Sequence, residues 1–137
     1  MSRRLLEIAV ASRLNGLLMR LPWSRSGTRL AWNDLSHAMI LLPEYSEEEV
    51  LAYAASCPLG RHEWAVLLKA FDSPPVLTTL VDAVRNFDEI LEGPGYIFGV
   101  DSLGLDESFV GYDLAEYDGG DRLTFLLNPP IDVRSDV

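Results

Sequence analysis

The period of the hydrophobic pattern changes near Gly95, and this change constrains the fold more than any other feature of the sequence. Before Gly95, apolar residues recur mainly every three or four positions, the spacing of helices that face a core. After it, residues 96–100, 108–117 and 122–127 are rich in aromatic and branched side chains, as strands are. Helices followed by strands predict an α+β fold, with N-terminal helices packed on a C-terminal antiparallel β-meander that ends in a hairpin.

The strongest helical pattern covers residues 74–92. Ser73 can cap this helix, two prolines fit its first turn, and Gly93 follows its end. Its apolar residues form one stripe: Leu77, Leu80, Val81, Val84, Phe87 and Leu91. We expect most of this stripe, and in particular Leu77, Leu80, Val84 and Phe87, to be buried against the sheet.

Two further helices are predicted, at residues 3–21 and 47–56. In the second, Ser46 and Glu49 fit a capping box, in which each side chain binds the other residue's exposed amide. The first has apolar residues at helical spacing and then a proline: Leu6, Val10, Leu14, Leu17, Leu21 and Pro22.

Three segments are harder to assign from periodicity. Residues 63–71 favour a helix, although an apolar stretch this short also fits a buried strand. Residues 34–42 fit either a helix or a buried strand, and residues 29–32 fit a short strand.

The sequence Asp118-Gly119-Gly120-Asp121 predicts a tight hairpin with a type I′ turn, because that turn requires a positive φ at both central residues. Asn128 and the two prolines after it end the predicted sheet, and residues 131–137 are expected to be a loose tail. With 137 residues, the chain is expected to form a single domain over residues 1–137.

The chain has one cysteine, Cys57, so an intrachain disulfide is excluded. It has neither an apolar run long enough to span a membrane nor the pattern of a secretory signal. We therefore expect a cytoplasmic protein.

Charge is distributed unevenly along the chain. The net charge is −10, yet residues 1–29 contain six arginines and one acid. Between Arg85 and Arg122 there are ten acids and no basic residue. A field of this sign repels nucleic acid and attracts basic surfaces.

Motifs for catalysis and for metal binding are scarce. The sequence has two histidines, His37 and His62, and lacks a nucleophile elbow and a phosphate-binding glycine loop. A Cys57–His62 dyad is disfavoured because a small cysteine beside Pro58 at a helix end is typical of a core. One cysteine and two histidines do not make a zinc site, and the hairpin acids do not fit a calcium loop. We therefore expect no metal, no cofactor and no enzymatic activity.

The acidic C-terminal region also contains several tyrosines, a combination that holds basic partners through ring area and charge pairing. The residues predicted to contact a partner are Asp113, Glu116, Tyr117, Asp118 and Asp121. In size, acidity and lack of catalytic motifs, the chain resembles bacterial immunity proteins, antitoxins and nucleic-acid mimics that neutralise a basic toxin or nuclease. That resemblance implies a basic protein partner whose substrate-binding cleft is occupied by carboxylates.

Three alternatives remain open at this point. One is a regulatory or adaptor module that binds through the arginine-rich N-terminal helix. Another is an enzyme that uses acids with His37 or His62 in a pocket between residues 74–92 and the sheet. The third is that the acidic face is only solvated and keeps the protein in solution.

Overall fold

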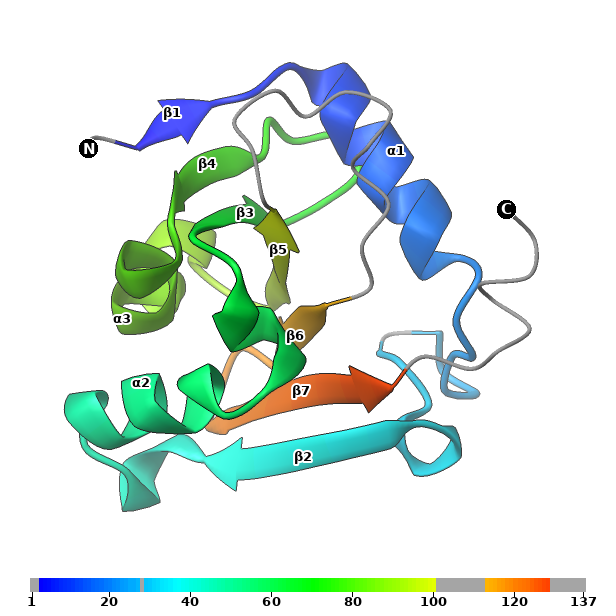
Figure 1. Cartoon of the computed structure of the whole chain (residues 1–137). Coiled ribbons are helices and arrows are strands. Elements are labelled where there is room, and N and C mark those ends of the chain that lie inside the picture. The colour runs from blue at the N-terminus through cyan, green and yellow to red at the C-terminus, as the bar shows by residue number, and fades with distance from the viewer. Residues whose placement is uncertain (1–2, 28, 101–112, 129–137) are drawn as a thin grey trace.

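A computed structural model describes residues 3–27, 29–100 and 113–128. In this part of the chain, seven strands form one antiparallel sheet in the order β1-β4-β3-β5-β6-β7-β2 (Figure 1). The strands are β1 (Arg4–Leu5), β2 (Ser36–Leu41), β3 (Trp64–Leu68), β4 (Val76–Thr79), β5 (Gly95–Val100), β6 (Leu114–Tyr117) and β7 (Arg122–Asn128). The helices are α1 (Ile8–Leu18), α2 (Glu47–Ala55) and α3 (Leu80–Leu91), with short 3-10 turns η1 (Trp32–Asp34), η2 (Leu42–Glu44) and η3 (Pro58–Arg61).

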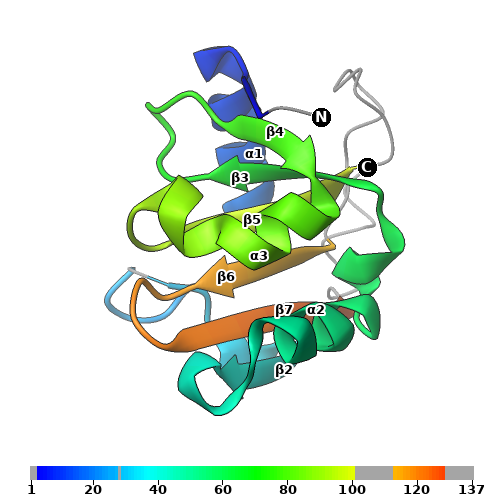
Figure 2. The same ribbon diagram turned by 90° about the vertical axis from the view of Figure 1, so that its left-hand side faces the viewer.

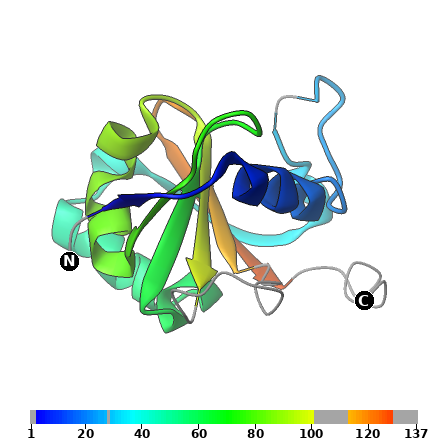
Figure 3. The ribbon, with the colours of Figure 1, turned by 90° about the horizontal axis from the view of Figure 1, so that it is seen from above.

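Helices cover both faces of the sheet. Figure 3 shows α1 on the opposite side of the strands from α3, and Figure 2 shows α2 and α3 together in front of the sheet. The side chains accordingly form two separate cores. The first, on the α1 face, includes Leu14, Leu18, Trp32, Phe98 and Leu126. The second, on the face covered by α2 and α3, includes Val84, Phe87, Ile97, Tyr117 and Phe125.

The α+β class is confirmed, but the predicted arrangement is not. The meander β5-β6-β7 is present at the C-terminal side, as expected. Four of the seven strands, however, come from the first 79 residues and extend the sheet on both sides of the meander. Helices and strands are therefore interspersed along the chain, and helices flank the sheet on both faces.

The helix predicted at residues 74–92 begins later, at Leu80. Residues 76–79 are strand β4, and Thr79 caps α3 by accepting a hydrogen bond from the amide of Asp82 at 3.1 Å. The burial of Leu77, Leu80, Val84 and Phe87 is confirmed. Val81, also expected in the stripe, is 47% exposed, since the buried face of α3 is formed by Leu80, Ala83, Val84, Phe87 and Leu91.

Of the other three predicted helices, one is confirmed, one is shorter than predicted and one is a strand. The helix at 47–56 and its capping box between Ser46 and Glu49 are confirmed. The helix at 3–21 is shorter, because Arg4 and Leu5 pair with β4 before α1 begins at Ile8. The helix at 63–71 is wrong: β3 lies between β4 and β5 with both faces covered, so its sequence shows no alternation.

Most of residues 34–42 form a strand, whereas the short strand predicted at residues 29–32 is not present. Ser36–Leu41 form β2, which pairs with β7 along the edge of the sheet. In the 29–32 segment, Leu30 makes only an isolated bridge to Trp23, and a 3-10 turn follows from Trp32.

The hairpin between β6 and β7 is present, but its turn is not type I′. Gly119 has a φ of 86°, whereas Gly120 does not have a positive φ. The carboxylate of Asp118 holds the turn by accepting hydrogen bonds from the amides of Gly120 at 2.8 Å and Arg122 at 3.0 Å. A side chain thus replaces the second left-handed residue.

Two predictions fall wholly or partly on residues outside the described ranges: the first part of the 108–117 strand and the 131–137 tail. Within the described residues, β6 begins at Leu114 and β7 ends at Asn128, next to the prolines. No described helix has the length and apolar character needed to cross a membrane.

Asp82 fastens the N-terminal strand to α3. Its carboxylate accepts hydrogen bonds from Arg3 at 2.8 and 3.0 Å, from the hydroxyl of Thr78 at 2.6 Å and from the amide of Asn86 at 2.9 Å. The bonds from Arg3 lower the pKa of Asp82 well below its usual range, Thr78 and Asn86 lower it further, and partial burial acts in the opposite direction.

Replacing Leu80 by Ala is expected to cost about 2 to 5 kcal/mol of unfolding free energy, because it empties a core leucine site. Val81→Ala on the same helix is the matched control and should change stability by less than about 0.5 kcal/mol. Urea unfolding at pH 7 measures both. Similar losses for the two variants would contradict the assigned helix face.

Asp82→Asn is expected to destabilise the protein by about 1.5 to 3 kcal/mol at pH 7, the range for hydrogen bonds to a charged group. Because the folded-state pKa is depressed, this contribution is complete above the unfolded-state value of about 3.9 and is lost as the pH falls below it. The difference from wild type should therefore shrink between about pH 5 and pH 2. Asp72→Asn, at an exposed position, should show no such difference, and a constant gap for Asp82→Asn down to pH 2 would contradict the role of its charge.

Candidate functional site

The five residues predicted to contact a partner do not share one surface. Alternation along β6 directs Glu116 to the α1 face and Tyr117 to the face covered by α2 and α3. Both are buried, with exposed fractions of 4% and 7%. Asp113 precedes β6 and Asp118 follows it, so they are separated by about 17 Å of extended chain.

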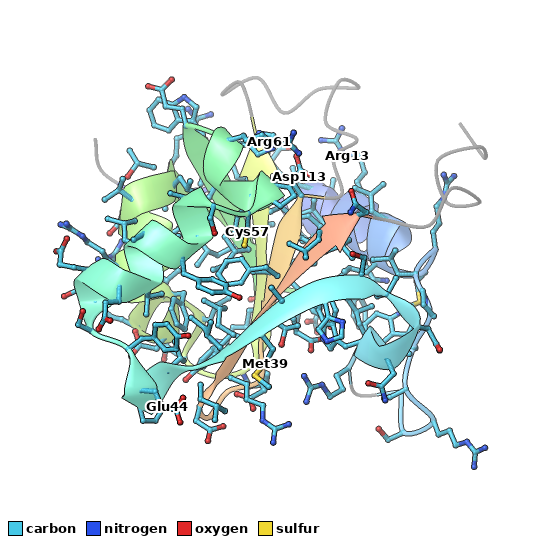
Figure 4. All side chains as sticks on the ribbon, turned by 60° about the horizontal axis from the view of Figure 1, so that its bottom comes forward. Arg13, Met39, Glu44, Cys57, Arg61 and Asp113 are labelled. Carbon is cyan, nitrogen blue, oxygen red and sulfur yellow. The ribbon has the colours of Figure 1, made fainter. Side chains whose placement is uncertain are left out.

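Asp113 takes part in an ion pair beside η3. Its carboxylate lies 2.7 Å from Nε2 of His62 and 3.8 Å from the guanidinium of Arg61. Figure 4 shows Arg61 and Asp113 close together, away from Glu44 at the other end of the molecule. The His62 ring lies against Gly99, where an added Cβ would be only 2.4 Å from the ring. Asp113 therefore holds η3 to the sheet.

Glu116 accepts hydrogen bonds from three groups in the α1-face core. The donors are the indole of Trp32 at 2.8 Å, the amide of Leu30 at 3.1 Å and the hydroxyl of Tyr96 at 3.1 Å. The guanidinium of Arg29 lies 3.3 Å from the same carboxylate. Burial, and then the charge of Glu116, raise the pKa of Tyr96, so its hydroxyl stays protonated and donates. Glu116 is therefore a structural anchor for residues 29–32.

Of the other three predicted residues, Tyr117 lines a groove of about 270 Å³ between α2, α3 and the hairpin, and the charges of Asp118 and Asp121, on the two sides of the lining residue Gly120, act on the Tyr117 hydroxyl. Ten residues line this acidic groove: Leu42, Tyr45, Glu47, Val50, Val84, Arg85, Phe87, Asp88, Tyr117 and Gly120. Tyr117 packs edge-on against Phe87 with ring centroids 4.8 Å apart, and its hydroxyl donates to the carbonyl of Gly120 at 3.2 Å. The inner part of the groove is therefore aromatic and fixed.

Carboxylates surround this aromatic surface. Burial raises the pKa of the Tyr117 hydroxyl. The negative charges of Asp88, Asp118 and Asp121 raise it further, because they disfavour a negatively charged phenolate nearby. The amide of Leu42 donates to the carbonyl of Asp121 at 2.7 Å, which brings the segment containing Glu44 and Glu47 to the same end of the sheet. Arg85, which also lines the groove, is paired with Glu48 at 3.2 Å.

The cysteine and histidines do not form a catalytic group in the described part of the chain. Burial raises the pKa of the Cys57 thiol, and the hydroxyl of Ser56 lies 4.0 Å from its sulfur. His37 lies on the α1 face against Trp32, with ring centroids 5.7 Å apart, whereas His62 lies on the other face against Gly99. Among the described residues, no group of three or more His, Cys, Asp or Glu side chains could hold a metal ion.

No protein-family model matches the chain, and no match is found among curated proteins or among solved structures.

Sequence reasoning identified the hairpin half of the acidic groove and missed the rest. Tyr45 and Glu47 come from one segment and Asp88 from another, both far from Tyr117 in the chain, and only the fold brings them together. The signal in the sequence is the group of acids at Glu44 and Glu47–Glu49, of which the capping box accounts only for Glu49.

Glu116→Gln is expected to cost about 3 to 5 kcal/mol of unfolding free energy, because it removes one partner of a buried ion pair and turns an amide NH₂ toward donors. Glu92→Gln is the matched control, since Glu92 is exposed and 3.9 Å from Lys69; it should cost less than about 0.5 kcal/mol. Chemical denaturation at pH 7 measures both. A loss below about 1 kcal/mol for Glu116→Gln would contradict the anchoring role.

Proposed function

We propose that the protein binds a basic protein through the acidic groove and neutralises it without catalysing a reaction. The observation that carries this proposal is the combination, in one place, of a fixed aromatic surface from Phe87 and Tyr117 with the carboxylates of Asp88, Asp118 and Asp121. Aromatic area and charge complementarity are the two features from which protein interfaces draw affinity and specificity.

The dimensions of the groove favour a side chain over a small molecule. Its volume of about 270 Å³ lies below the usual range of about 300 to 1,000 Å³ for small-molecule sites. An arginine of the partner fits this chemistry well. Its N–H groups can pair with the exposed carboxylates of Asp88 and Asp121, while its apolar stem lies against the small part of Tyr117 and Phe87 that lines the groove.

The walls of the groove are held in place before any partner binds. The capping box of Ser46 and Glu49 fixes the start of α2, and the Asp118 carboxylate fixes the hairpin turn. A preorganised surface loses little conformational entropy on binding.

The net charge of −10 would steer a basic partner toward the protein from a distance. In this proposal the partner is a toxin or nuclease with a positively charged cleft, and the protein inhibits it by filling that cleft. Exclusion of substrate is then steric and electrostatic.

Two alternatives have less support. In the adaptor alternative the N-terminal arginines contact a partner, but Arg3 is already bound to Asp82 and the apolar side of α1 lies in the core. In the enzyme alternative His37 or His62 works in a pocket between the 74–92 segment and the sheet, but His37 lies on the face opposite α3, and His62 is paired with Asp113 and does not line the groove beside α3.

The double variant Asp88→Lys/Asp121→Lys is expected to lower the association rate with the basic partner about tenfold at low salt, because it reverses charge at the groove. Both side chains are exposed, and Asp118 is left intact because it holds the turn. The partner is first identified by affinity capture from the native host. Association rates are then measured by surface plasmon resonance at about 50 and 150 mM salt.

Glu63→Lys/Asp72→Lys is the matched control, with the same change in net charge at two exposed positions, one directly before β3 and one in the turn between β3 and β4. It should reduce the rate far less and leave the dissociation rate unchanged. Equal effects of the two double variants, or the absence of a basic partner, would show that the acidic face is only solvated.

A further inference from the structure

The α1 face of the sheet carries a second pocket, of opposite charge to the acidic groove. It has a volume of about 580 Å³ and lies between residues 23–25, residues 29–34 and strands β2 and β7. We call it the basic pocket; the lining residues on which the argument depends are Arg25, Arg29, Trp32, His37, Arg122 and Thr124. Three arginines around one pocket are unexpected on a chain with a net charge of −10.

Thr124 gives this pocket an unsatisfied polar group. The residue is 1% exposed and lines the pocket, and its hydroxyl oxygen has no hydrogen-bond partner among the described residues. Buried hydroxyls are almost always hydrogen-bonded, because leaving one without a partner is costly. A ligand that accepts a hydrogen bond in the pocket would satisfy it.

The cations of the pocket are available to a ligand. Neither Arg25 nor Arg122 has an acidic side-chain partner among the described residues, whereas Arg29 is paired with the buried Glu116 at 3.3 Å. Asp34 also lines the pocket and offsets part of the positive charge. Guanidinium groups bind phosphate oxygens two at a time, which favours a phosphate over a singly charged anion.

The pocket is also too large for a phosphate alone. Its volume is in the range of sites that hold small organic molecules. Ring surface is present, because Trp32 and His37 lie 5.7 Å apart and Trp23 lines the same pocket. The indoles are fixed by hydrogen bonds: that of Trp32 to Glu116 at 2.8 Å and that of Trp23 to the carbonyl of Leu18 at 2.9 Å.

We infer that the basic pocket binds a small molecule that carries both a phosphate group and a planar ring, as a nucleoside monophosphate does. Arg25 and Arg122 hold the phosphate, the Thr124 hydroxyl donates to it, and the aromatic side chains contact the ring. A nucleic acid polymer is disfavoured, because its many phosphates would meet the overall negative field. The inference does not rest on the proposed function, since the pocket and the acidic groove lie on opposite faces of the sheet.

The test is a titration of the isotope-labelled protein with AMP, adenosine and inorganic phosphate, followed by NMR. Two of the three tryptophans, Trp23 and Trp32, line the pocket, while Trp64 lies in β3 and is an internal control. AMP is expected to shift the indole N–H signals of Trp23 and Trp32 and to leave that of Trp64 in place. Adenosine and inorganic phosphate should each bind at least about tenfold more weakly than AMP, because each lacks half of the recognised groups.

Two variants test the residues directly. Arg122→Gln and Thr124→Val should each weaken AMP binding about tenfold or more, the effect of losing a hydrogen bond to a charged group. Thr124→Val should leave the free protein at least as stable as wild type, since it removes an unsatisfied hydroxyl and keeps the shape; this separates ligand binding from a structural role. Arg4→Gln is the control, because β1 lies at the opposite edge of the sheet from β2.

Three results would overturn the inference. The first is the absence of binding with AMP at about 5 mM. The second is adenosine or inorganic phosphate binding as tightly as AMP. The third is wild-type affinity in both Arg122→Gln and Thr124→Val.

Discussion

The buried carboxylate of Glu116 is the interaction on which the α1 face of the structure depends. It lies in the middle of the sheet and binds donors from Leu30, Trp32 and Tyr96. A charge in such a place is stable only when its oxygens are fully hydrogen-bonded. Glu116 therefore fixes where residues 29–32 cross the sheet, and that crossing forms one wall of the basic pocket.

Because side chains alternate along a strand, one short stretch of chain contributes residues to the sites on both faces of the sheet. Glu116 and Tyr117 are neighbours in sequence, yet one organises a basic pocket and the other forms the inner surface of the acidic groove. The same holds on β7, where Arg122 and Thr124 line the pocket while Leu123 and Phe125 belong to the core under α2 and α3. The opposite charges are thus kept apart by the sheet itself.

Elements with a local signal could be predicted from the sequence. The capping box of α2, the buried face of α3 and the three-stranded meander each depend on spacing within a few residues. Strand β3 could not be predicted, because a strand covered on both faces has no alternation and its apolar run fits a helix equally well. Strand β4 was hidden because Ser73 and the two prolines before it resemble the start of a helix, and Leu77 fits the spacing of the stripe.

The predicted contact residues show the same limit. Asp118 and Asp121 lie at the groove, as a hairpin turn should place them, whereas Glu116 is buried among donors from three distant segments. The sequence around Glu116 contains no indication that an indole and an amide some 85 positions away will bind its carboxylate. The basic pocket is equally hidden, since its arginines come from residues 25–29 and 122.

The pairing of β2 with β7 has a consequence for how the protein is made. β2 ends at Leu41, and the strand that it pairs with does not end until Asn128. At a synthesis rate of about 5 to 20 residues per second, β2 exists for roughly 4 to 17 seconds before its neighbour is complete. During that time Ile40 and the backbone groups of β2 have no sheet to join. The nascent chain therefore passes through an interval in which this strand is unpaired and open to pairing with other chains.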